Sequence, residues 1–214
     1  MKHENISTSV IRRLPRYYRY LGYLHSNGVT RVSSKELSEK MGLTASQIRQ
    51  DLNCFGGFGQ QGYGYIVEDL HMHIGNILGI AKNYGAILLG AGNLGRALAS
   101  NMSFEKRGFK LLGIFDKSEE LIGQSINGTE IMSGDGETLR NFCELHKPAM
   151  AVLCIPREAV ADAVDILIDS GVNSFWNFSH YDISLKYPDT LVENVHLNDS
   201  LTTLCYFVNE RQGK

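Results

Sequence analysis

A glycine-rich turn constrains the fold of this chain more than any other feature of its sequence. The short apolar run 86–89 leads into Gly90-Ala91-Gly92-Asn93-Leu94-Gly95, and a helix-forming segment follows at once. In a strand–turn–helix, the first glycine makes a tight turn, the second lets the backbone approach a pyrophosphate, and the third lets helix and strand pack closely. Free N–H groups at the helix start favour an anion there. The segment predicts a dinucleotide-binding α/β sheet, with a glycine turn that holds no ligand as the alternative.

An acidic residue stands where such a sheet holds the ribose of its ligand. The second apolar strand, 111–115, ends in Asp116, about 20 residues beyond the last glycine. A carboxylate at this place accepts hydrogen bonds from the adenosine ribose and repels a 2′-phosphate, so the pattern favours NADH and NAD⁺ over NADP. The neighbouring Lys117 leaves NADP open, since a cation tolerates a phosphate.

Strands and helices alternate through the rest of residues 85–196. We expect strands at 149–155, 175–178 and 191–195, with an amphipathic helix at 157–169. This succession predicts a Rossmann-like, doubly wound parallel sheet whose ligand binds at the carboxyl ends of the strands. Those ends supply the candidates for the nicotinamide half of the site, which are Cys154, Ile155, Pro156, Asn177, Phe178 and Ser179.

Residues 197–214 predict a terminal helix with a strongly apolar stripe. A helix of this kind must bury its apolar face. It either packs on its own domain or is exchanged with a second subunit, and in the second case Leu197 of the partner subunit reaches the ligand pocket.

Residues 1–84 have a different pattern and predict a winged helix-turn-helix. Ser33 opens a short helix with the Ser-x-x-Glu spacing of a capping box, and Gly42 supplies its left-handed stop. Thr44 then opens a second helix, 45–54, with a similar capping spacing. Two short capped helices joined by a tight turn form a helix-turn-helix.

Three further segments complete this first domain. The segment 6–24 is an amphipathic helix in which Pro15 either starts the main helix or kinks it. Aromatic residues alternate with glycine in 55–65 and continue into a strand through Val67, which predicts a β-hairpin wing, or merely a packed hairpin. A connecting helix is expected at 71–83. The wing candidates for DNA contact are Gln60, Gln61 and Tyr63.

The first domain is basic although the whole chain is not. Residues 1–55 hold nine Lys or Arg and four Asp or Glu, a balance of +5, which leaves −7 for the remainder of a chain of net charge −2. A basic module on an acidic body suggests a polyanionic partner, and the second helix carries side chains that can read base edges. A helical domain that binds another protein is the alternative. The candidates on this helix are Ser46, Gln47, Arg49 and Gln50.

Composition excludes several classes of protein. No apolar run is long enough to span a bilayer, and the polar segment 1–9 lacks a signal core, so we expect a cytoplasmic protein. The four cysteines form no CxxC pair and sit in apolar stretches, which favours core residues over disulfides. No metal-ligand pattern is apparent, since His71 and His73 have the wrong spacing for one helix face.

Four segments together resemble the Rex family of redox-sensing repressors. These segments are VIRRLPRYYRYL at 10–21, TASQIRQDL at 44–52, the glycine turn at 90–95 and VENVHLNDSL at 192–201, in the family's order over essentially the whole chain. The resemblance implies a homodimer with two winged helices, two Rossmann domains and a domain-swapped C-terminal helix. It also implies binding to a pseudo-palindromic double-stranded DNA operator, which NADH weakens in competition with NAD⁺.

The resemblance assigns roles by position and shows departures. It places Arg13 and Arg16 on DNA beside the helix residues already named, and Arg19 matches an arginine that forms a state-dependent salt bridge in some members. Asn101 stands where some members have a switching tyrosine, and His196 where some have a switching aspartate. Gln50 and the wing glutamines replace Lys or Arg of many relatives, which predicts fewer phosphate contacts and a shallower salt dependence.

Two other classes of function remain open on the sequence. An NAD-dependent dehydrogenase with an N-terminal helical module would need an acid or base, and His180 past a strand end is the one candidate. No paired carboxylate or substrate clamp accompanies it, so we expect no enzyme. A CoA- or nucleotide-binding scaffold that recruits a protein through its helix-turn-helix is the third reading.

Overall fold

The computed structural model describes residues 6–59 and 63–213. The chain divides into two compact units, Met1–Ala81 (unit 1) and Lys82–Lys214 (unit 2). The sequence placed this division after residue 84. Each unit has its own hydrophobic core, and each is described by itself below.

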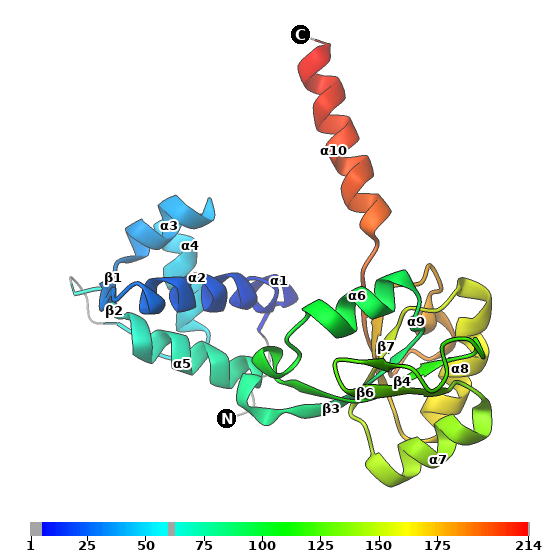
Figure 1. The fold of residues 1–214 in the computed structure, drawn as a ribbon. Coiled ribbons are helices and arrows are strands. Elements are labelled where there is room, and N and C mark those ends of the chain that lie inside the picture. Colours follow the sequence, from blue (N-terminus) through cyan, green and yellow to red (C-terminus); the bar gives the residue numbers. More distant parts are fainter. Residues whose placement is uncertain (1–5, 60–62, 214) are drawn as a thin grey trace. The chain divides into compact units, whose positions relative to one another are not determined.

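Unit 1 is a small helical domain with a two-stranded sheet (Figure 1). Pro15 lies at the start of its longest helix, so it begins the helix and does not kink it. Leu14, Tyr17 and Leu21 are buried at helical spacing and form the centre of the core. The elements are α1 (Thr8–Ile11), α2 (Leu14–Ser26), β1 (Arg31–Val32), α3 (Ser34–Met41), α4 (Ala45–Asn53), β2 (Tyr65–Ile66), α5 (Val67–Leu78) and η1 (Ile80–Lys82).

Side-chain caps delimit the helix-turn-helix, as predicted. The Ser33 hydroxyl accepts a hydrogen bond from the Glu36 N–H and the Glu36 carboxylate accepts one from the Ser33 N–H, a complete capping box. Gly42 ends α3 in the left-handed region at φ 64°. The Thr44 hydroxyl accepts from the Gln47 N–H and starts α4.

The wing prediction was wrong in its pairing. The strand after the helix-turn-helix, β2, pairs antiparallel with β1, which precedes the helix-turn-helix in the chain. Residues 55–59, the described part of the segment before its tip, form no strand. The glycines of that segment offer few side chains to hold a hairpin of its own, whereas Tyr65 and Val32 are buried in the core. Residues 60–62, which include the predicted tip glutamines, lie outside the described residues.

The connecting helix is also displaced from its prediction of 71–83. Val67 begins α5 and does not extend a strand, and the helix ends at Leu78 because Gly79 adopts the left-handed conformation at φ 73°. Val67 and Leu70 are buried, so the helix starts where its apolar face meets the core of unit 1.

Unit 2 contains a seven-stranded sheet in the order β5-β6-β4-β3-β7-β8-β9. All neighbours are parallel except the β5–β6 hairpin, which confirms the Rossmann-like arrangement. The elements are β3 (Tyr84–Leu89), α6 (Asn93–Asn101), η2 (Glu105–Arg107), β4 (Phe109–Asp116), β5 (Ser125–Ile126), β6 (Thr129–Ser133), α7 (Gly136–His146), β7 (Met150–Leu153), α8 (Arg157–Asp169), β8 (Ser174–Asn177), α9 (Ile183–Lys186), β9 (Leu191–Asn194) and α10 (Leu197–Gln212).

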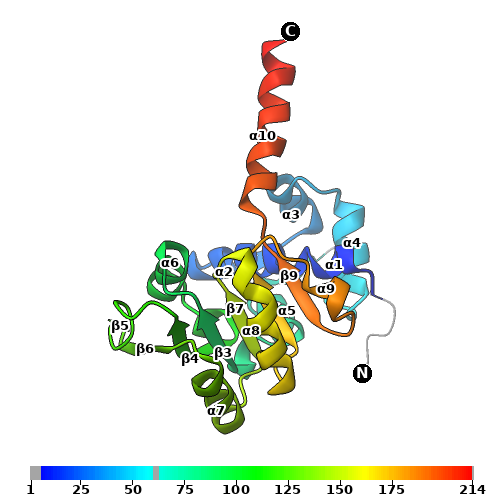
Figure 2. The ribbon, with the colours of Figure 1, turned by 90° about the vertical axis from the view of Figure 1, so that its right-hand side faces the viewer.

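The two faces of this sheet are covered unequally. On one face, side chains from α7, α8 and α9 form a core with the strands. On the other face, α6 and the adjoining loop supply the helical cover, and α6 and α7 lie on opposite sides of the sheet in both views (Figure 2). Apolar side chains of the last three strands therefore line an open pocket on the α6 face.

Helix α10 buries none of its residues within the single chain. Among the described residues, no helix is both long and apolar enough to cross a membrane. The large apolar side chains that α10 leaves exposed are Leu197, Leu201, Leu204, Tyr206, Phe207 and Val208.

Candidate functional site

The glycine turn after β3 is closely packed at its first and third glycines. Gly90 has φ 96°, and a Cβ there would lie 2.5 Å from the carbonyl oxygen of Cys154, the residue that follows β7. A Cβ on Gly95 would lie 1.8 Å from the Gly90 carbonyl oxygen. Both positions therefore require glycine, the first to turn beside β7 and the third to let α6 rest on the strand.

The second glycine has the opposite surroundings. Gly92 forms the N-cap of α6, and an added Cβ would meet nothing within 4 Å. Gly92, Asn93 and Leu94 are exposed at the start of the helix. An open, side-chain-free approach to a helix N-terminus suits a pyrophosphate, because backbone N–H groups and the helix dipole face it. The residues present thus fit a dinucleotide.

Asp116 at the end of β4 is held against the glycine turn. Its Oδ2 accepts a hydrogen bond of 2.6 Å from the Ala91 N–H, and its Oδ1 accepts one of 2.8 Å from the Ser118 N–H. The Asp116 carbonyl oxygen accepts from the Gly134 N–H at 2.7 Å. These hydrogen bonds fix the Asp116 carboxylate at the end of β4, directly beside Ala91 and next to the exposed Gly92.

A pocket of about 320 Å³ lies at the carboxyl ends of β3, β4 and β7, where the strand order reverses. It brings together seven of the predicted site residues, Gly90, Gly92, Asp116, Lys117, Cys154, Ile155 and Pro156. Sequence reasoning missed Gly134, which follows β6 and also lines the pocket. Its signal was a glycine at a strand end, in Ser133-Gly134-Asp135. Burial raises the pKa of the Cys154 thiol in this pocket to about 12.

Four predicted nicotinamide residues lie outside this pocket lining, namely Asn177, Phe178, Ser179 and Leu197. Asn177 and Ser179 are buried, and the Ser179 hydroxyl donates to the Asn177 Oδ1 at 2.7 Å. Phe178 packs edge-on against Trp176, with ring centroids 4.7 Å apart, on the α6 face of the sheet. Leu197 is 62% exposed at the start of α10. Their assignment to the ligand stays a prediction, and for Leu197 it depends on a second subunit.

The polar side chains of α4 divide by face. Ile48, Asp51 and Leu52 are buried, while Ser46, Arg49 and Gln50 are exposed and Gln47 is half-buried. One face of α4 is therefore free to meet a ligand. Tyr63 is also exposed.

The predicted DNA-contacting arginines differ in what they touch. Arg49 donates to the Ser34 hydroxyl at 3.0 Å and Arg16 donates to the Met41 carbonyl at 2.8 Å, and both side chains are exposed. Arg13 instead forms a two-pronged ion pair with the buried Asp51, at 2.6 and 2.7 Å. This ion pair raises the pKa of the Arg13 guanidinium.

The three candidate switch residues have separate environments. Arg19 is exposed on α2. Asn101 at the end of α6 donates to the Ala97 carbonyl at 3.0 Å. His196, the N-cap of α10, stacks on His180 with ring centroids 5.3 Å apart, and its buried Nδ1 has no hydrogen-bond partner within the described chain. His180, the candidate acid or base of the dehydrogenase hypothesis, is therefore stacked on another imidazole ring.

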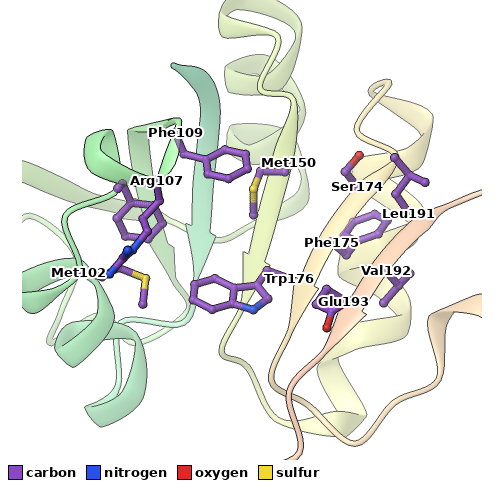
Figure 3. Close-up of a pocket in the computed structure, with 11 residues that line it drawn as sticks. Met102, Arg107, Phe109, Met150, Ser174, Phe175, Trp176, Leu191, Val192 and Glu193 are labelled. Carbon is purple, nitrogen blue, oxygen red and sulfur yellow. The ribbon is translucent and has the colours of Figure 1, made fainter. Parts of the chain in front are cut away.

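A second pocket, of about 580 Å³, opens on the α6 face of the sheet. Figure 3 shows Trp176 and Met150 between the segment 102–109 on one side and β9 on the other. Its lining is mainly apolar and far richer in aromatic rings than the pocket at the glycine turn. In the described parts of the chain, His, Cys, Asp and Glu side chains form no group of three or more that would hold a metal ion.

Two known families match the chain, one within unit 1 and one almost entirely within unit 2. Residues 5–53 match a family described as "Putative DNA-binding protein N-terminus". Residues 81–181 match a family described as "CoA binding domain".

Full-length relatives are repressors. The chain is 53% identical over 212 residues to the redox-sensing transcriptional repressor Rex of Thermoanaerobacter pseudethanolicus, covering 99% of this chain and 93% of that protein. It is 51% identical to the Rex repressor of Clostridium beijerinckii, covering 99% of each. The crystal structure of RSP in complex with β-NAD⁺ and operator DNA matches with a TM-score of 0.89 and 52% identity, covering 97% of this chain and 94% of that one. RSP in complex with β-NADH matches with a TM-score of 0.87 and 49% identity, covering 97% and 96%.

Proposed function

Because the chain belongs to the Rex family of redox-sensing transcriptional repressors, we propose that it binds an operator and releases that DNA when NADH binds. One observation carries the proposal. A helix-turn-helix with an exposed polar face and a glycine cradle beside an acidic strand end occur in the same chain. Unit 1 supplies the DNA contacts and unit 2 the dinucleotide site.

The DNA contacts follow from the exposed face of α4. Arg49 and Gln50 have the donors and acceptors that discriminate guanine and adenine in a major groove. Arg16 retains free donors for a phosphate beyond its bond to Met41. Ser46, Gln47, Tyr63 and the wing glutamines complete the proposed contacts.

The preference for the reduced ligand follows from charge. Oxidised nicotinamide carries one positive ring charge that the reduced ring lacks. Ile155 and Pro156 after β7 and Ala159 on α8 give this part of the pocket an apolar lining. The burial of an unpaired charge in such surroundings is costly. The Asp116 carboxylate lies beside the glycine turn. There it accepts hydrogen bonds from the ribose hydroxyls and repels a 2′-phosphate.

We include a homodimer in the proposal. Helix α10 exposes six large apolar side chains and buries none within its own chain, while the sheet leaves an apolar pocket open on its α6 face. In a dimer, the apolar face of α10 packs against the second copy, and the second copy also covers the apolar pocket. The twofold axis of such a dimer matches a pseudo-palindromic operator. Exchange of α10 between subunits would bring Leu197 of the partner subunit to the ligand.

Ligand binding acts on this dimer through its differential affinity for two arrangements. Two recognition helices must be spaced about one helical turn of DNA apart to read both half-sites. An arrangement that NADH stabilises and that changes this spacing releases the operator. Arg19, Asn101 and His196 remain the candidates for residues that differ between the two arrangements.

We propose that the chain acts as a regulator and not as a dehydrogenase. Relatives of about half-identical sequence are repressors, and His180 stacks on His196 at the base of α10. A protein that acts on operator DNA works where the chromosome is, so a cytoplasmic location belongs to the same proposal.

Fluorescence anisotropy of a labelled palindromic duplex at fixed salt tests the proposal. We expect tight binding that NADH reverses and NAD⁺ does not. Binding that ignores both would leave a DNA-binding protein with another ligand, and CoA is then added because residues 81–181 match a CoA-binding family. Failure to bind any duplex, with NADH still bound, would favour the scaffold reading.

Gly92→Ala is the matched control for this experiment. Its Cβ enters the open approach to the α6 N-terminus and touches nothing in the protein. The variant should bind the operator as the unsubstituted protein does and lose its response to NADH. A variant that still responds would show that the ligand acts elsewhere.

A further inference from the structure

A carboxylate lies in the buried stripe of the proposed recognition helix. Asp51 is 3% exposed and occupies α4 between Ile48 and Leu52, which face the core of unit 1. A buried charge must be paired and hydrogen-bonded to be tolerated. The structure shows three donors on this carboxylate.

All three donors come from the first turns of α2. Arg13, the N-cap of α2, donates from Nε to Oδ2 at 2.6 Å and from Nη2 to Oδ1 at 2.7 Å. Tyr17, one turn later and fully buried, donates its hydroxyl to Oδ2 at 2.7 Å. Burial, followed by this hydrogen bond, raises the pKa of Tyr17, so it stays protonated as a donor.

We infer that Arg13 is a positioning residue that sets the recognition helix through Asp51, and is not a phosphate contact. The inference rests on the proposed function and changes the role that the family resemblance assigned to Arg13. The Arg13 side chain is 19% exposed, and the fork of its guanidinium matches the two carboxylate oxygens of Asp51.

The geometry explains why such a device is useful on this helix. Ile48 and Leu52 make non-directional apolar contacts, which tolerate small rotations of α4 about its axis. A two-pronged ion pair is directional and fixes the rotation at which Asp51 points to α2. The same rotation sets the direction of Ser46, Arg49 and Gln50 on the exposed face.

Single variants that break the ion pair, compared with a variant that replaces it by apolar side chains, test the inference in the full-length protein. Arg13→Gln and Asp51→Asn should each weaken operator binding at least about tenfold, because the first leaves the buried Asp51 carboxylate without its counter-charge and the second removes the charge that holds Arg13 in place. Arg13→Met combined with Asp51→Leu and Tyr17→Phe replaces the whole hydrogen-bonded cluster by apolar side chains of similar size, leaves no buried hydroxyl without an acceptor, and keeps the net charge unchanged. This paired variant should recover operator affinity to within about threefold.

The salt dependence separates positioning from phosphate contact. A plot of log affinity against log salt concentration has a negative slope, and each lost phosphate contact makes that slope shallower by about 0.9. We expect the paired variant to keep the slope of the unsubstituted protein, while the comparison variant Arg16→Met lowers it. A paired variant that stays weak with a lowered slope would overturn the inference, and so would single variants that bind normally.

Two controls keep the outcome readable. Tyr17→Phe retains the ring in the core and removes only one donor, so it should weaken binding less than Arg13→Gln, again with an unchanged slope. If a single variant fails to fold by circular dichroism, the paired variant and Tyr17→Phe decide the question. Absence of operator binding by the unsubstituted protein would refute the proposed function itself. If the unsubstituted protein binds the operator and the paired variant shows a shallower salt dependence, only the role of Arg13 is refuted.

Discussion

Two alanine substitutions two and five residues into the glycine turn should have opposite effects. At Gly95, a new Cβ lies 1.8 Å from the Gly90 carbonyl oxygen, so α6 must move away from β3 by about 1.6 Å to reach an ordinary contact of 3.4 Å. Overpacking of this kind costs about 1–3 kcal/mol. At Gly92 the new Cβ touches nothing, and the backbone at φ −67° is one that alanine adopts. That substitution should stabilise the free protein by about 0.4–1 kcal/mol through the unfolded state.

Thermal unfolding without ligand and calorimetric titration with NADH measure the two effects. Gly95→Ala should lower the Tm by roughly 2–12 °C and weaken NADH binding because the start of α6 is displaced. Gly92→Ala should keep or raise the Tm and still weaken NADH binding at least about tenfold, since its methyl group occupies the approach of the pyrophosphate. Equal Tm values for the two variants would refute the steric reasoning. Unchanged NADH affinity in Gly92→Ala would refute the placement of the ligand.

Three further predictions concern protonation, cofactor choice and thiol access. Burial, and next the neighbouring His25, lower the pKa of His71 from its ordinary 6.5, so unit 1 should lose stability as pH falls below that value. Urea unfolding at two pH values should show this loss vanish in His71→Phe and persist in a variant of the exposed His73. Asp116→Asn should shift the NADPH-to-NADH ratio of Kd values about tenfold towards NADPH, because a negative charge is lost beside the 2′ position. A disulfide reagent should label Cys54 rapidly and the enclosed thiols slowly, and protection of Cys205 should appear on dimerisation.

The sequence predicted best where a residue's own chemistry determines the local structure. Ser33, Gly42 and the glycines of the turn after β3 act through caps, left-handed dihedrals and close approach, and the structure shows each of them doing so. The hairpin β5–β6 was not predicted, although its turn has a sequence of the same informative kind. Asn127 and Gly128 both adopt positive φ at its turn, as an Asn-Gly hairpin requires.

Contacts between distant segments were harder to foresee. The pairing of β1 with β2 spans more than thirty residues, and two-residue strands have no periodicity to read. Asp51 occupies a helix position that looks apolar by spacing, and only the approach of Arg13 from another helix explains a charge there. Gly134 reaches the dinucleotide pocket because β6 lies beside β4, which follows from strand order and not from any local motif.

Helix α10 links the stability of this protein to its concentration. A helix of sixteen residues with no buried side chain gains no burial of apolar surface from its own chain to offset the entropy of ordering. In the proposed dimer that entropy is offset only by the partner, so folding of the C-terminal segment and assembly form one equilibrium governed by mass action. The Tm should therefore rise with protein concentration. In a cell, the number of copies would determine how many are competent to meet a twofold operator, before any change in the redox state is sensed.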